Sequence, residues 1–268
     1  MQKIVLITGA TSGLGNAMAK SLSKEGFKVY ATGRKITQES DGSNLLFKYM
    51  DVKNNDSVIG TVNSIIEKEN RIDILINNAG TGLAGPLEEI PFEDIYNVFE
   101  TNYFGTIRVI KQVVPVMRKN NSGLIVNTSS IGGEVGLPFQ SVYTSSKFAV
   151  ESLTEALSIE LRPFGIKVCL IQPGDYRTNV NSHKRSVIPD KDSPYYKRLK
   201  HFFELLENNI EEGSDPEKMG KLIVKVANSS APSLRYRSGK FFERITPPSK
   251  NIIPDRIFER ILQRFYNL

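Results

Sequence analysis

Two side chains capable of acid–base chemistry, Tyr143 and Lys147, stand four residues apart near the middle of the chain. On a helix, this spacing places both side chains on one face, one turn apart. An ammonium group beside a phenol favours the phenolate, so we expect the pKa of Tyr143 to fall from about 10 toward the working pH. A phenol with such a pKa serves as a general acid or base. The same pair occurs by chance on surface helices, so by itself it is only a candidate.

The segment before this pair changes from apolar to polar. An apolar run at residues 124–126 ends in the hydroxyl residues Thr128, Ser129 and Ser130. Glycines at 132, 133 and 136 and a proline at 138 then interrupt regular structure, and a helical pattern begins near Tyr143. The sequence therefore predicts a buried strand, an irregular polar connection, and then the helix that carries the candidate pair.

A glycine-rich turn lies near the start of the chain. Gly9, Gly13 and Gly15 follow a buried strand at residues 4–7 and precede an amphipathic helix at residues 16–25. Glycines let the backbone turn sharply and bring its N–H groups against a pyrophosphate at a helix N-terminus. The spacing, Gly-x-x-x-Gly-x-Gly, differs from the common Gly-x-Gly-x-x-Gly fingerprint. Its position between a buried strand and a helix nevertheless favours a dinucleotide site over an ordinary turn.

The second strand, residues 28–32, ends in Gly33 and Arg34. In this architecture an acidic residue at the end of the second strand holds the adenosine ribose of NAD(H). A guanidinium suits a 2′-phosphate instead, because its planar fork matches the phosphate oxygens. We therefore predict a preference for NADP(H); the alternative is that Arg34 is an ordinary surface arginine.

The remaining elements predict the fold class. Residues 45–50, 72–76 and 167–171 indicate strands, a short seventh strand is expected near residues 234–237, and helical patterns occupy residues 55–70, 92–119 and 215–228. Strands that alternate with helices at this period are typical of an α/β fold, here a Rossmann-like, doubly wound parallel sheet of about seven strands with helices on both faces. Asn102 lies inside the long helical stretch among aromatic residues, so it is either a structural or a functional residue.

Composition narrows the class of protein further. The 268 residues suit one large domain or two small ones, and we predict a single domain over residues 1–268. The single Cys169 excludes an internal disulfide, and the scattered His and Cys residues have no metal-ligand spacing. No apolar run approaches the roughly 20 residues of a membrane span, and the first residues show no signal-peptide pattern, so we expect a cytoplasmic protein.

The net charge of +6 comes from the last third of the chain, where residues 177–268 carry 18 Lys and Arg against 11 Asp and Glu. Basic and acidic residues alternate there, which indicates a solvated surface. Nothing in the pattern is typical of a nucleic-acid reader, so we expect no nucleic-acid partner. Attraction to a membrane surface is the less favoured alternative.

A specific set of motifs runs in order through roughly residues 1–180: Thr8-Gly9-x-x-x-Gly13-x-Gly15, Asp51, Asn77-Asn78-Ala79-Gly80, Asn102, Ser130, Tyr143-x-x-x-Lys147, and Pro173-Gly174 with Thr178. In this order and spacing the set resembles the short-chain dehydrogenase/reductase family. Gly33 and Arg34 are similar to its one-domain, NADP(H)-preferring branch, and residues 27–34 are similar to members that act on steroids, retinoids and other lipophilic carbonyls. The resemblance implies an NADP(H)-dependent oxidoreductase that interconverts a carbonyl and an alcohol.

The resemblance also implies roles for individual residues. Tyr143 protonates the carbonyl oxygen, Lys147 lowers the pKa of Tyr143 and binds the nicotinamide ribose, and Ser130 polarises the carbonyl. Asn102 is implied to hold a water that links Lys147 to solvent. The residues implied to bind the cofactor are Gly9, Thr11, Ser12, Gly13, Leu14, Gly15, Arg34, Asp51, Val52, Asn78, Gly80, Tyr143, Lys147, Pro173, Gly174 and Thr178.

Residues 179–212 form the region in which this family varies, and we expect them to act as the substrate loop. Aromatic and aliphatic residues follow at helical spacing between residues 195 and 210, either as ordinary helix packing or as one wall of a substrate cleft. The other wall is predicted from four residues, Leu83, Ala84, Leu137 and Phe139. Such a cleft favours an apolar carbonyl substrate.

Residues 246–268 form a C-terminal extension, and residues 254–268 predict a strongly amphipathic helix with arginines at 256, 260 and 264. This helix packs on the body of the protein, covers a neighbouring subunit or lies on an anionic membrane, in decreasing order of preference. We expect a homodimer or homotetramer, because related proteins pair through the helices that contain Asn102 and Tyr143.

Two other classes of protein remain as alternatives. A catalytically weak NADP(H)-binding sensor or scaffold would be expected to lose catalytic residues. The four implied catalytic residues, Asn102, Ser130, Tyr143 and Lys147, are all present here. A sugar-nucleotide epimerase shares the Tyr-x-x-x-Lys pair but usually carries a larger substrate domain than the residues after Pro173 allow.

Overall fold

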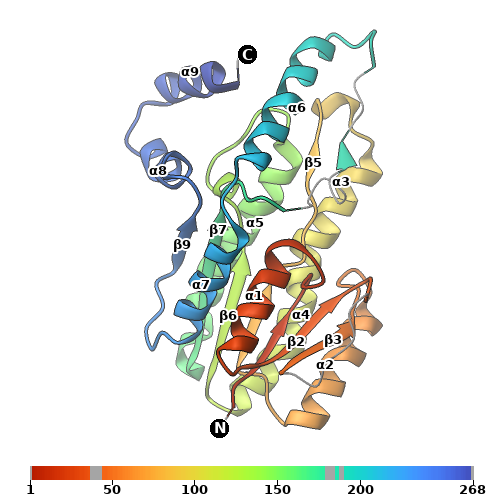
Figure 1. Cartoon of the computed structure of the whole chain (residues 1–268), viewed down its shortest axis with the longest axis vertical. Helices are drawn as coiled ribbons and strands as arrows, with labels where there is room; N and C mark the ends of the chain where they lie inside the picture. The colour runs from red at the N-terminus through yellow and green to blue at the C-terminus, as the bar shows by residue number, and fades with distance from the viewer. Residues whose placement is uncertain (1, 37–43, 179–184, 187–189, 267–268) are drawn as a thin grey trace.

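Seven parallel strands form the centre of the computed structural model, which describes residues 2–36, 44–178, 185–186 and 190–266 (Figure 1). The strand order is β3-β2-β1-β4-β6-β7-β9, and every neighbouring pair is parallel. The bounds are β1 Ile4–Ile7, β2 Lys28–Gly33, β3 Leu45–Tyr49, β4 Ile74–Asn77, β6 Gly123–Thr128, β7 Ile166–Pro173 and β9 Arg235–Ser238. The predicted α/β class and doubly wound sheet are confirmed.

Side-chain alternation along β1 shows why both faces of the sheet are covered. Val5 and Ile7 face one apolar cluster, and Ile4 and Leu6 face another, because successive side chains on a strand point to opposite faces. On the first face lie α1 (Gly13–Lys24) and α7 (Pro216–Ala227). On the second lie α2 (Asn55–Glu69), α4 (Gly105–Lys119) and α5 (Ser141–Glu160). Both apolar layers stabilise the sheet by removing its two faces from water.

The strand order reverses direction between β1 and β4. From β1 the chain moves outward through β2 and β3, and it then returns to place β4 on the other side of β1. In open α/β sheets, ligands bind outside the carboxyl ends of the strands at this switch point. The turns that follow β1 and β4 are the glycine-rich turn and the Asn78–Gly80 segment, so the topology itself brings these two motifs together.

The long helix predicted at residues 92–119 is interrupted in the structure. It consists of α3 (Phe92–Phe99), a π-helical turn at Glu100–Phe104 and then α4. A π turn accommodates one extra residue, so side chains after it change face, and such turns are frequent at functional sites. Asn102, which is buried, lies inside this turn.

Several elements lie outside the central sheet. A two-stranded parallel pair joins β5 (Leu83–Ala84) to β8 (Arg185–Ser186), and α6 (Tyr196–Glu211) crosses the carboxyl edge of the sheet. After β9, the chain forms α8 (Phe241–Lys250) and α9 (Asp255–Tyr266), which lie beside the upper part of α6 in Figure 1. Three 3-10 turns complete the helices of the described residues, at Leu87–Glu89, Ile131–Gly133 and Arg162–Phe164.

The short strands and α8 are absent from the sequence-based prediction. In α8, Pro247 and Pro248 argue against a helix, since proline lacks the N–H group and is costly in a helix interior. Both prolines nevertheless lie in the last turn of α8, and Pro247 is buried. None of the helices in the described residues is both long enough and apolar enough to cross a bilayer. Residues 179–184 and 187–189 of the predicted substrate loop lie outside the described residues.

Candidate active site

The glycine-rich turn is closed tightly against the segment after β4. Gly9 has a φ of +61°, and a Cβ added there would lie 2.7 Å from the Cα of Ala79. A Cβ added to Gly15 would lie 2.3 Å from the carbonyl oxygen of Gly9. The helix α1 begins at Gly13, earlier than predicted, and its N-cap residue Ser12 makes no side-chain capping bond. The first-turn amides of α1 therefore suit an anion such as a pyrophosphate.

Asn78 is positioned as a clamp on this turn. Its Nδ2 donates to the carbonyl oxygens of Thr8 and Gly9 at 3.1 and 2.9 Å. In return, Thr8 Oγ1 accepts from the backbone N–H groups of Asn78 and Ala79 at 3.0 and 2.9 Å. The side chain of Asn78 thus fixes the cradle itself, and a direct contact with the cofactor remains a prediction.

The end of β2 lies next to the same turn. A Cβ added to Gly33 would lie 2.8 Å from the side chain of Thr11, so only a glycine lets these two segments approach. Arg34 follows Gly33 and is exposed. Its guanidinium is therefore available to a phosphate bound at the edge of the turn, as predicted for an adenosine 2′-phosphate.

The segment after β3 forms a further wall of the cradle. Asp51 Oδ1 accepts from the backbone N–H of Lys53 at 3.0 Å, which fixes the turn after the strand. Val52 is buried, and its Cγ2 lies 2.8 Å from the position of a Cβ added to Gly105 in α4. The structure brings Asp51 and Val52 to the carboxyl edge, and their contact with the adenine remains a prediction.

The segment after β7 also reaches the glycine-rich turn. Thr178 lies 3.7 Å from the position of a Cβ added to Gly13, so two predicted cofactor residues from distant parts of the chain meet. Pro173 is the last residue of β7, and Gly174 N donates to the carbonyl oxygen of Ser238 at 2.7 Å. The glycine-rich turn and the segment after β7 therefore lie next to each other at the carboxyl edge of the sheet.

Glu243 occupies the corner between Gly174 and Gly239. A Cβ added to either glycine would lie 2.1 or 2.2 Å from Glu243 Oε2. The carboxylate accepts from the backbone N–H groups of Lys240 at 2.7 Å and Asp175 at 3.3 Å. Burial raises the pKa of Glu243, and the charge of Asp175 acts in the same direction while the backbone bonds oppose it. Glu243, which lies in α8, thereby supports the segment after β7.

The catalytic candidates lie where β6 ends and α5 begins. Ser130 follows β6, and its Oγ accepts from the backbone N–H of Gly132 at 3.1 Å. The Ser130 side chain lies close enough to the Tyr143 hydroxyl to lower its pKa, and Tyr143 is partly buried near the start of α5. The predicted irregular connection therefore brings the serine and the tyrosine together across the break.

Lys147 is buried one turn further along α5. Its Nζ donates to the carbonyl oxygen of Thr128 at 2.9 Å and lies 5.9 Å from the centroid of the Tyr143 ring. Burial lowers the pKa of Lys147 to about 8, and the carboxylate of Glu151, one turn later, opposes this shift. The pair predicted from spacing thus shares one helix face, as expected.

The expected lowering of the Tyr143 pKa is wrong for this structure. Burial raises the pKa, the hydrogen bond from Ser130 lowers it, and the negative charge of Asp175 raises it. The physical reason is burial, which disfavours the charged phenolate; the Lys147 ammonium, held by Thr128 with its Nζ 5.9 Å from the ring centroid, does not offset it.

Asn102 lies next to Lys147, although it comes from a different helix. Its Oδ1 accepts from Thr81 N at 2.8 Å, and its Nδ2 donates to Thr81 O at 3.0 Å and to Ser146 Oγ at 2.9 Å. A Cβ added to Gly80 would lie 3.3 Å from Asn102 Oδ1 and 3.5 Å from Lys147 Nζ. The structure therefore brings Asn102, Gly80 and Lys147 together, and the water expected at Asn102 remains a prediction.

Two buried polar groups behind the site were not predicted. Asn77 donates to Asn127, and Asn127 donates to Thr154, at 2.9 Å each, which links β4, β6 and α5. Gln172 and Arg235 both donate to the buried carboxylate of Glu151 at 2.9 Å. The sequence gives only a weak signal for these residues. Asn77 and Asn127 lie near the ends of two apolar strands, and Glu151 comes one helical turn after Lys147.

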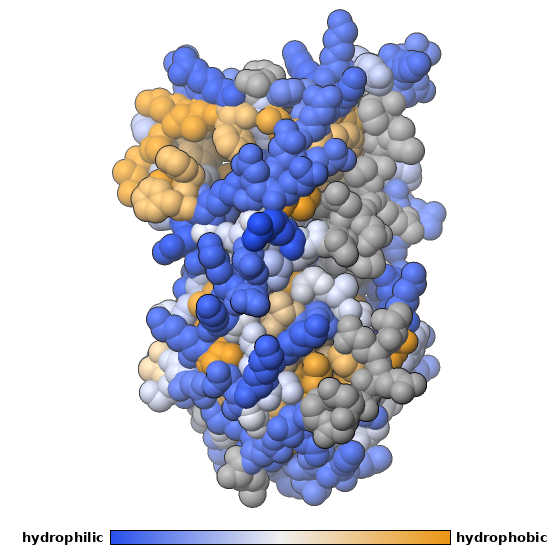
Figure 2. Space-filling model, viewed as in Figure 1, coloured by the Kyte–Doolittle hydropathy of each residue, from blue (hydrophilic) through white to orange (hydrophobic). Residues whose placement is uncertain are grey.

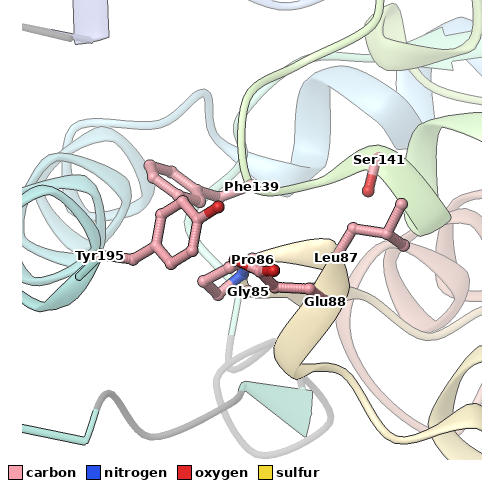
Figure 3. Close-up of a pocket in the computed structure, with 7 residues that line it drawn as sticks. All are labelled: Gly85, Pro86, Leu87, Glu88, Phe139, Ser141 and Tyr195. Carbon is pink, nitrogen blue, oxygen red and sulfur yellow. The ribbon is translucent and has the colours of Figure 1, made fainter. Parts of the chain in front are cut away.

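A pocket of about 500 Å³ opens beside the start of α5 (Figure 3). In the close-up, Phe139 and Tyr195 pack edge to face on one side of it, with ring centroids 6.3 Å apart and an interplanar angle of 86°. Its remaining lining residues are Gly85, Pro86, Leu87, Glu88 and Ser141. Phe139, predicted as a wall, lines this pocket, while Ala84 packs with Leu199 and Phe202 of α6 behind it.

Comparison with known proteins identifies the family. The family described as short chain dehydrogenase matches residues 3–188, which is more than half of the chain. A 3-ketodihydrosphingosine reductase of Bacteroides thetaiotaomicron is 39% identical over 265 residues, covering 98% of each chain. Retinol dehydrogenase 8 of Bos taurus is 35% identical over 266 residues, covering 91% of this chain and 83% of the relative.

A solved structure shares the same fold. ElxO with NADP bound has a TM-score of 0.73 and 28% identity, and the match covers 88% of this chain and 96% of that one. The fold and the placement of the catalytic candidates define an oxidoreductase. The chain belongs to the short-chain dehydrogenase/reductase family, as the sequence motifs predicted, and its relatives include enzymes named for retinol and for a keto lipid.

Proposed function

We propose that this protein uses NADP(H) to interconvert a lipophilic carbonyl compound and its alcohol, with Tyr143 as the acid or base. The observation that carries the proposal is the placement of Ser130 beside Tyr143, one turn from the buried Lys147 and at the same sheet edge as the glycine-rich turn. A carbonyl that gains a hydride needs both a hydrogen-bond donor and a proton donor at its oxygen.

The cofactor proposal rests on the fit of the cradle. The uncapped first turn of α1 suits the pyrophosphate, the closeness of Thr178 to Gly13 extends the cradle toward β7, and the exposed Arg34 suits a 2′-phosphate. The structure of ElxO with NADP bound supports the same choice. Replacing Arg34 with Asp should move the preference toward NAD(H), measured as kcat/KM with each cofactor; an unchanged preference for NADPH would remove the 2′-phosphate assignment.

The residues of the chain then act on the carbonyl oxygen. When bound, the cofactor supplies or accepts the hydride. In reduction, Ser130 Oγ donates a hydrogen bond to the oxygen as negative charge develops, and the Tyr143 hydroxyl transfers its proton to that oxygen. The phenolate that remains lies beside the Lys147 ammonium, whose position Thr128 fixes. In oxidation the same proton returns to Tyr143, so one side chain serves both directions.

The substrate class follows from the pocket and the relatives. Phe139, Tyr195 and Leu87 give the pocket an aromatic and aliphatic lining that suits a hydrocarbon chain. The relatives named for retinol and 3-ketodihydrosphingosine support a lipophilic substrate. We therefore propose long-chain ketones as the first substrates to assay, with residues 179–212 as the substrate loop and residues 246–268 as a C-terminal extension of a single domain.

The assembly and location remain part of the proposal. We infer a homodimer or homotetramer that pairs through α4 and α5, because Phe104 and Phe148 on these segments are exposed. Exposed aromatic side chains on paired helices are typical of subunit interfaces. We propose a cytoplasmic location, consistent with the free, buried Cys169.

The decisive experiment replaces Tyr143 with Phe and measures both turnover and NADPH binding. With a panel of ketones that includes 3-ketodihydrosphingosine, kcat should fall by about 10²- to 10⁴-fold, the usual contribution of a general acid. NADPH binding should persist, and Tyr49→Phe, at an exposed tyrosine of β3, should keep full activity as the control. An active Tyr143→Phe variant would overturn the mechanism, and a wild-type protein that binds NADPH tightly without consuming it would favour the sensor alternative.

A further inference from the structure

The C-terminal helix α9 has four stripes of side chains at four-residue spacing, of which one is the polar set Asp255, Glu259 and Gln263 and the other three are apolar or basic. Phe258, Leu262 and Tyr266, at four-residue spacing, face the body of the protein, where the Tyr266 ring packs 5.8 Å from that of Phe202 in α6. Four-residue spacing places each set of three residues on one face of the helix. Packing on the body of the protein, the preferred expectation for this helix, therefore involves only the stripe of Phe258, Leu262 and Tyr266.

The stripe beside it is apolar and exposed to solvent. Ile257, Ile261 and Phe265 are 50%, 49% and 59% exposed. The third stripe, on the far side of these residues, consists of Arg256, Arg260 and Arg264, all of them exposed. On a helix that lies in a membrane interface, apolar side chains enter the acyl region while flanking arginines reach the phosphate groups. The order of the three stripes matches that geometry.

The apolar surface continues onto α8 and the turn after it. Phe241 and Phe242 are 67% and 77% exposed, and Ile252 is 83% exposed. Figure 2 shows these elements as an apolar patch at the upper left of the molecule, with hydrophilic side chains around it. Apolar residues scattered singly are normal on a protein surface, whereas a contiguous exposed patch marks a site of interaction.

The charge of this segment favours one kind of partner. Residues 240–266 carry six Lys and Arg against three Asp and Glu, so the patch is bordered by net positive charge. Anionic phospholipids attract basic residues near their surface, and the attraction falls with salt. A second copy of this chain would bring the same basic stripe against itself, which is unfavourable.

We propose that α8 and α9 form a docking surface for an anionic lipid bilayer, with Ile257, Ile261 and Phe265 inserted among the acyl chains. The same helix reaches the substrate side of the protein through Tyr266, Phe202 and Phe139, which pack in sequence down to the pocket. A membrane bound on α9 thus lies one layer of aromatic side chains away from the pocket. Lipid binding is independent of turnover, so it stands or falls apart from the catalytic proposal.

The absence of tryptophan from the sequence offers a direct test. Phe265→Trp gives a single fluorophore on the exposed stripe, and Tyr96→Trp gives one on α3, where Tyr96 is 70% exposed on the other side of the molecule (Figure 1). With vesicles of phosphatidylcholine and phosphatidylglycerol, the emission of Phe265→Trp should shift to shorter wavelength, and that of Tyr96→Trp should not. Equal shifts, or none at position 265, would overturn the proposal.

Co-sedimentation with the same vesicles separates the two contributions. Changing Ile257, Ile261 and Phe265 together to Ser should weaken binding at least about tenfold, because apolar insertion supplies most of the affinity. Changing Arg256, Arg260 and Arg264 together to Gln should abolish the preference for anionic over pure phosphatidylcholine vesicles. A matched pair, Phe92→Ser with Tyr96→Ser on α3, should bind as the wild type does.

A folding control and an assembly control complete the experiment. Thermal unfolding of each variant should match the wild type, since the changed side chains are exposed. If the Phe265→Trp emission shifts with protein concentration alone and vesicles add nothing, the stripe contacts a second copy of the chain, and the membrane proposal is wrong.

Discussion

At the carboxyl edge of the sheet, the catalytic candidates are held by polar bonds to the backbone, whereas beside the pocket α6 and α9 meet through aromatic rings. Lys147 is fixed by a carbonyl of β6, and Asn102 by both backbone groups of Thr81. Phe202 instead packs between Phe139, Phe203 and Tyr266 with centroids 5.5 to 5.8 Å apart. Directional bonds fix the catalytic candidates to one geometry, while ring contacts tolerate changes of side-chain shape, so we expect substitutions in the two regions to have separate effects.

The largest expected effect tests the polar side of this comparison. Arg235→Ala removes the ion-pair partner of Glu151, whose side chain is only 6% exposed, and leaves the buried carboxylate hydrogen-bonded to Gln172. Breaking a buried ion pair in this way costs about 3–5 kcal/mol. The measurement is the free energy of unfolding in urea. Arg237→Ala, whose partner Glu134 is partly exposed, should cost about 0–1 kcal/mol; equal losses would contradict the distinction.

A second test concerns Asn102. Asn102→Ala should lower the free energy of unfolding by about 1–3 kcal/mol, because both backbone groups of Thr81 lose an Asn102 partner in a buried site. The loss of order beside Lys147 should lower kcat more than it raises KM. Asn97→Ala, near the end of α3 and bonded to Lys53, serves as the control and should leave kcat unchanged. A KM effect without a kcat effect would place Asn102 on the substrate side.

The third test concerns the aromatic side. Phe139→Ala should lower kcat/KM for long-chain ketones by about tenfold, the value of roughly 1–2 kcal/mol of apolar contact. Short-chain ketones, which do not reach the pocket, should react as before, and the pH profile should not move. Leu87→Ala, on the opposite wall, provides the matched variant. A loss that is equal for short and long substrates would show that Phe139 acts on the catalytic edge.

The smallest expected effect lies at the boundary between the two regions. The charge of Asp175 raises the pKa of Tyr143, so Asp175→Asn should lower that pKa. In alcohol oxidation the phenolate is the active form, so the rising limb of the kcat/KM profile should move to lower pH. Glu207→Gln, at an exposed position of α6, should leave the profile unchanged. A shift to higher pH, or none, would remove Asp175 from the electrostatics of Tyr143.

The relative placement of the catalytic candidates was predictable because their motifs report local geometry: Tyr143 and Lys147 share a helix face, and the glycines follow a buried strand. The strands were predictable for the same reason, since apolar runs such as residues 4–7 occur where both faces of a sheet are buried. The π turn around Asn102, the helix α8 with its two prolines, and the pair β5–β8 depend on tertiary contacts and carry no comparable local signal. The direction of the Tyr143 pKa shift also depends on burial, which no spacing reveals.

The carboxylate of Glu243 has a consequence for exchanging C-terminal segments among relatives. It fills the volume that a side chain at position 174 or 239 would need, and it accepts from the amide of Asp175. Gly174 and Asp175 follow β7, Gly239 follows β9 and Glu243 lies in α8, yet their side chains and backbone fit one another and must be exchanged together. A chimera joined between β9 and α8 would bring a foreign residue against Gly174 and disturb the turn that precedes Thr178. A junction placed after Glu243, inside α8, would let the rest of α8 and all of α9 be exchanged while the packing of Glu243 against Gly174 is kept.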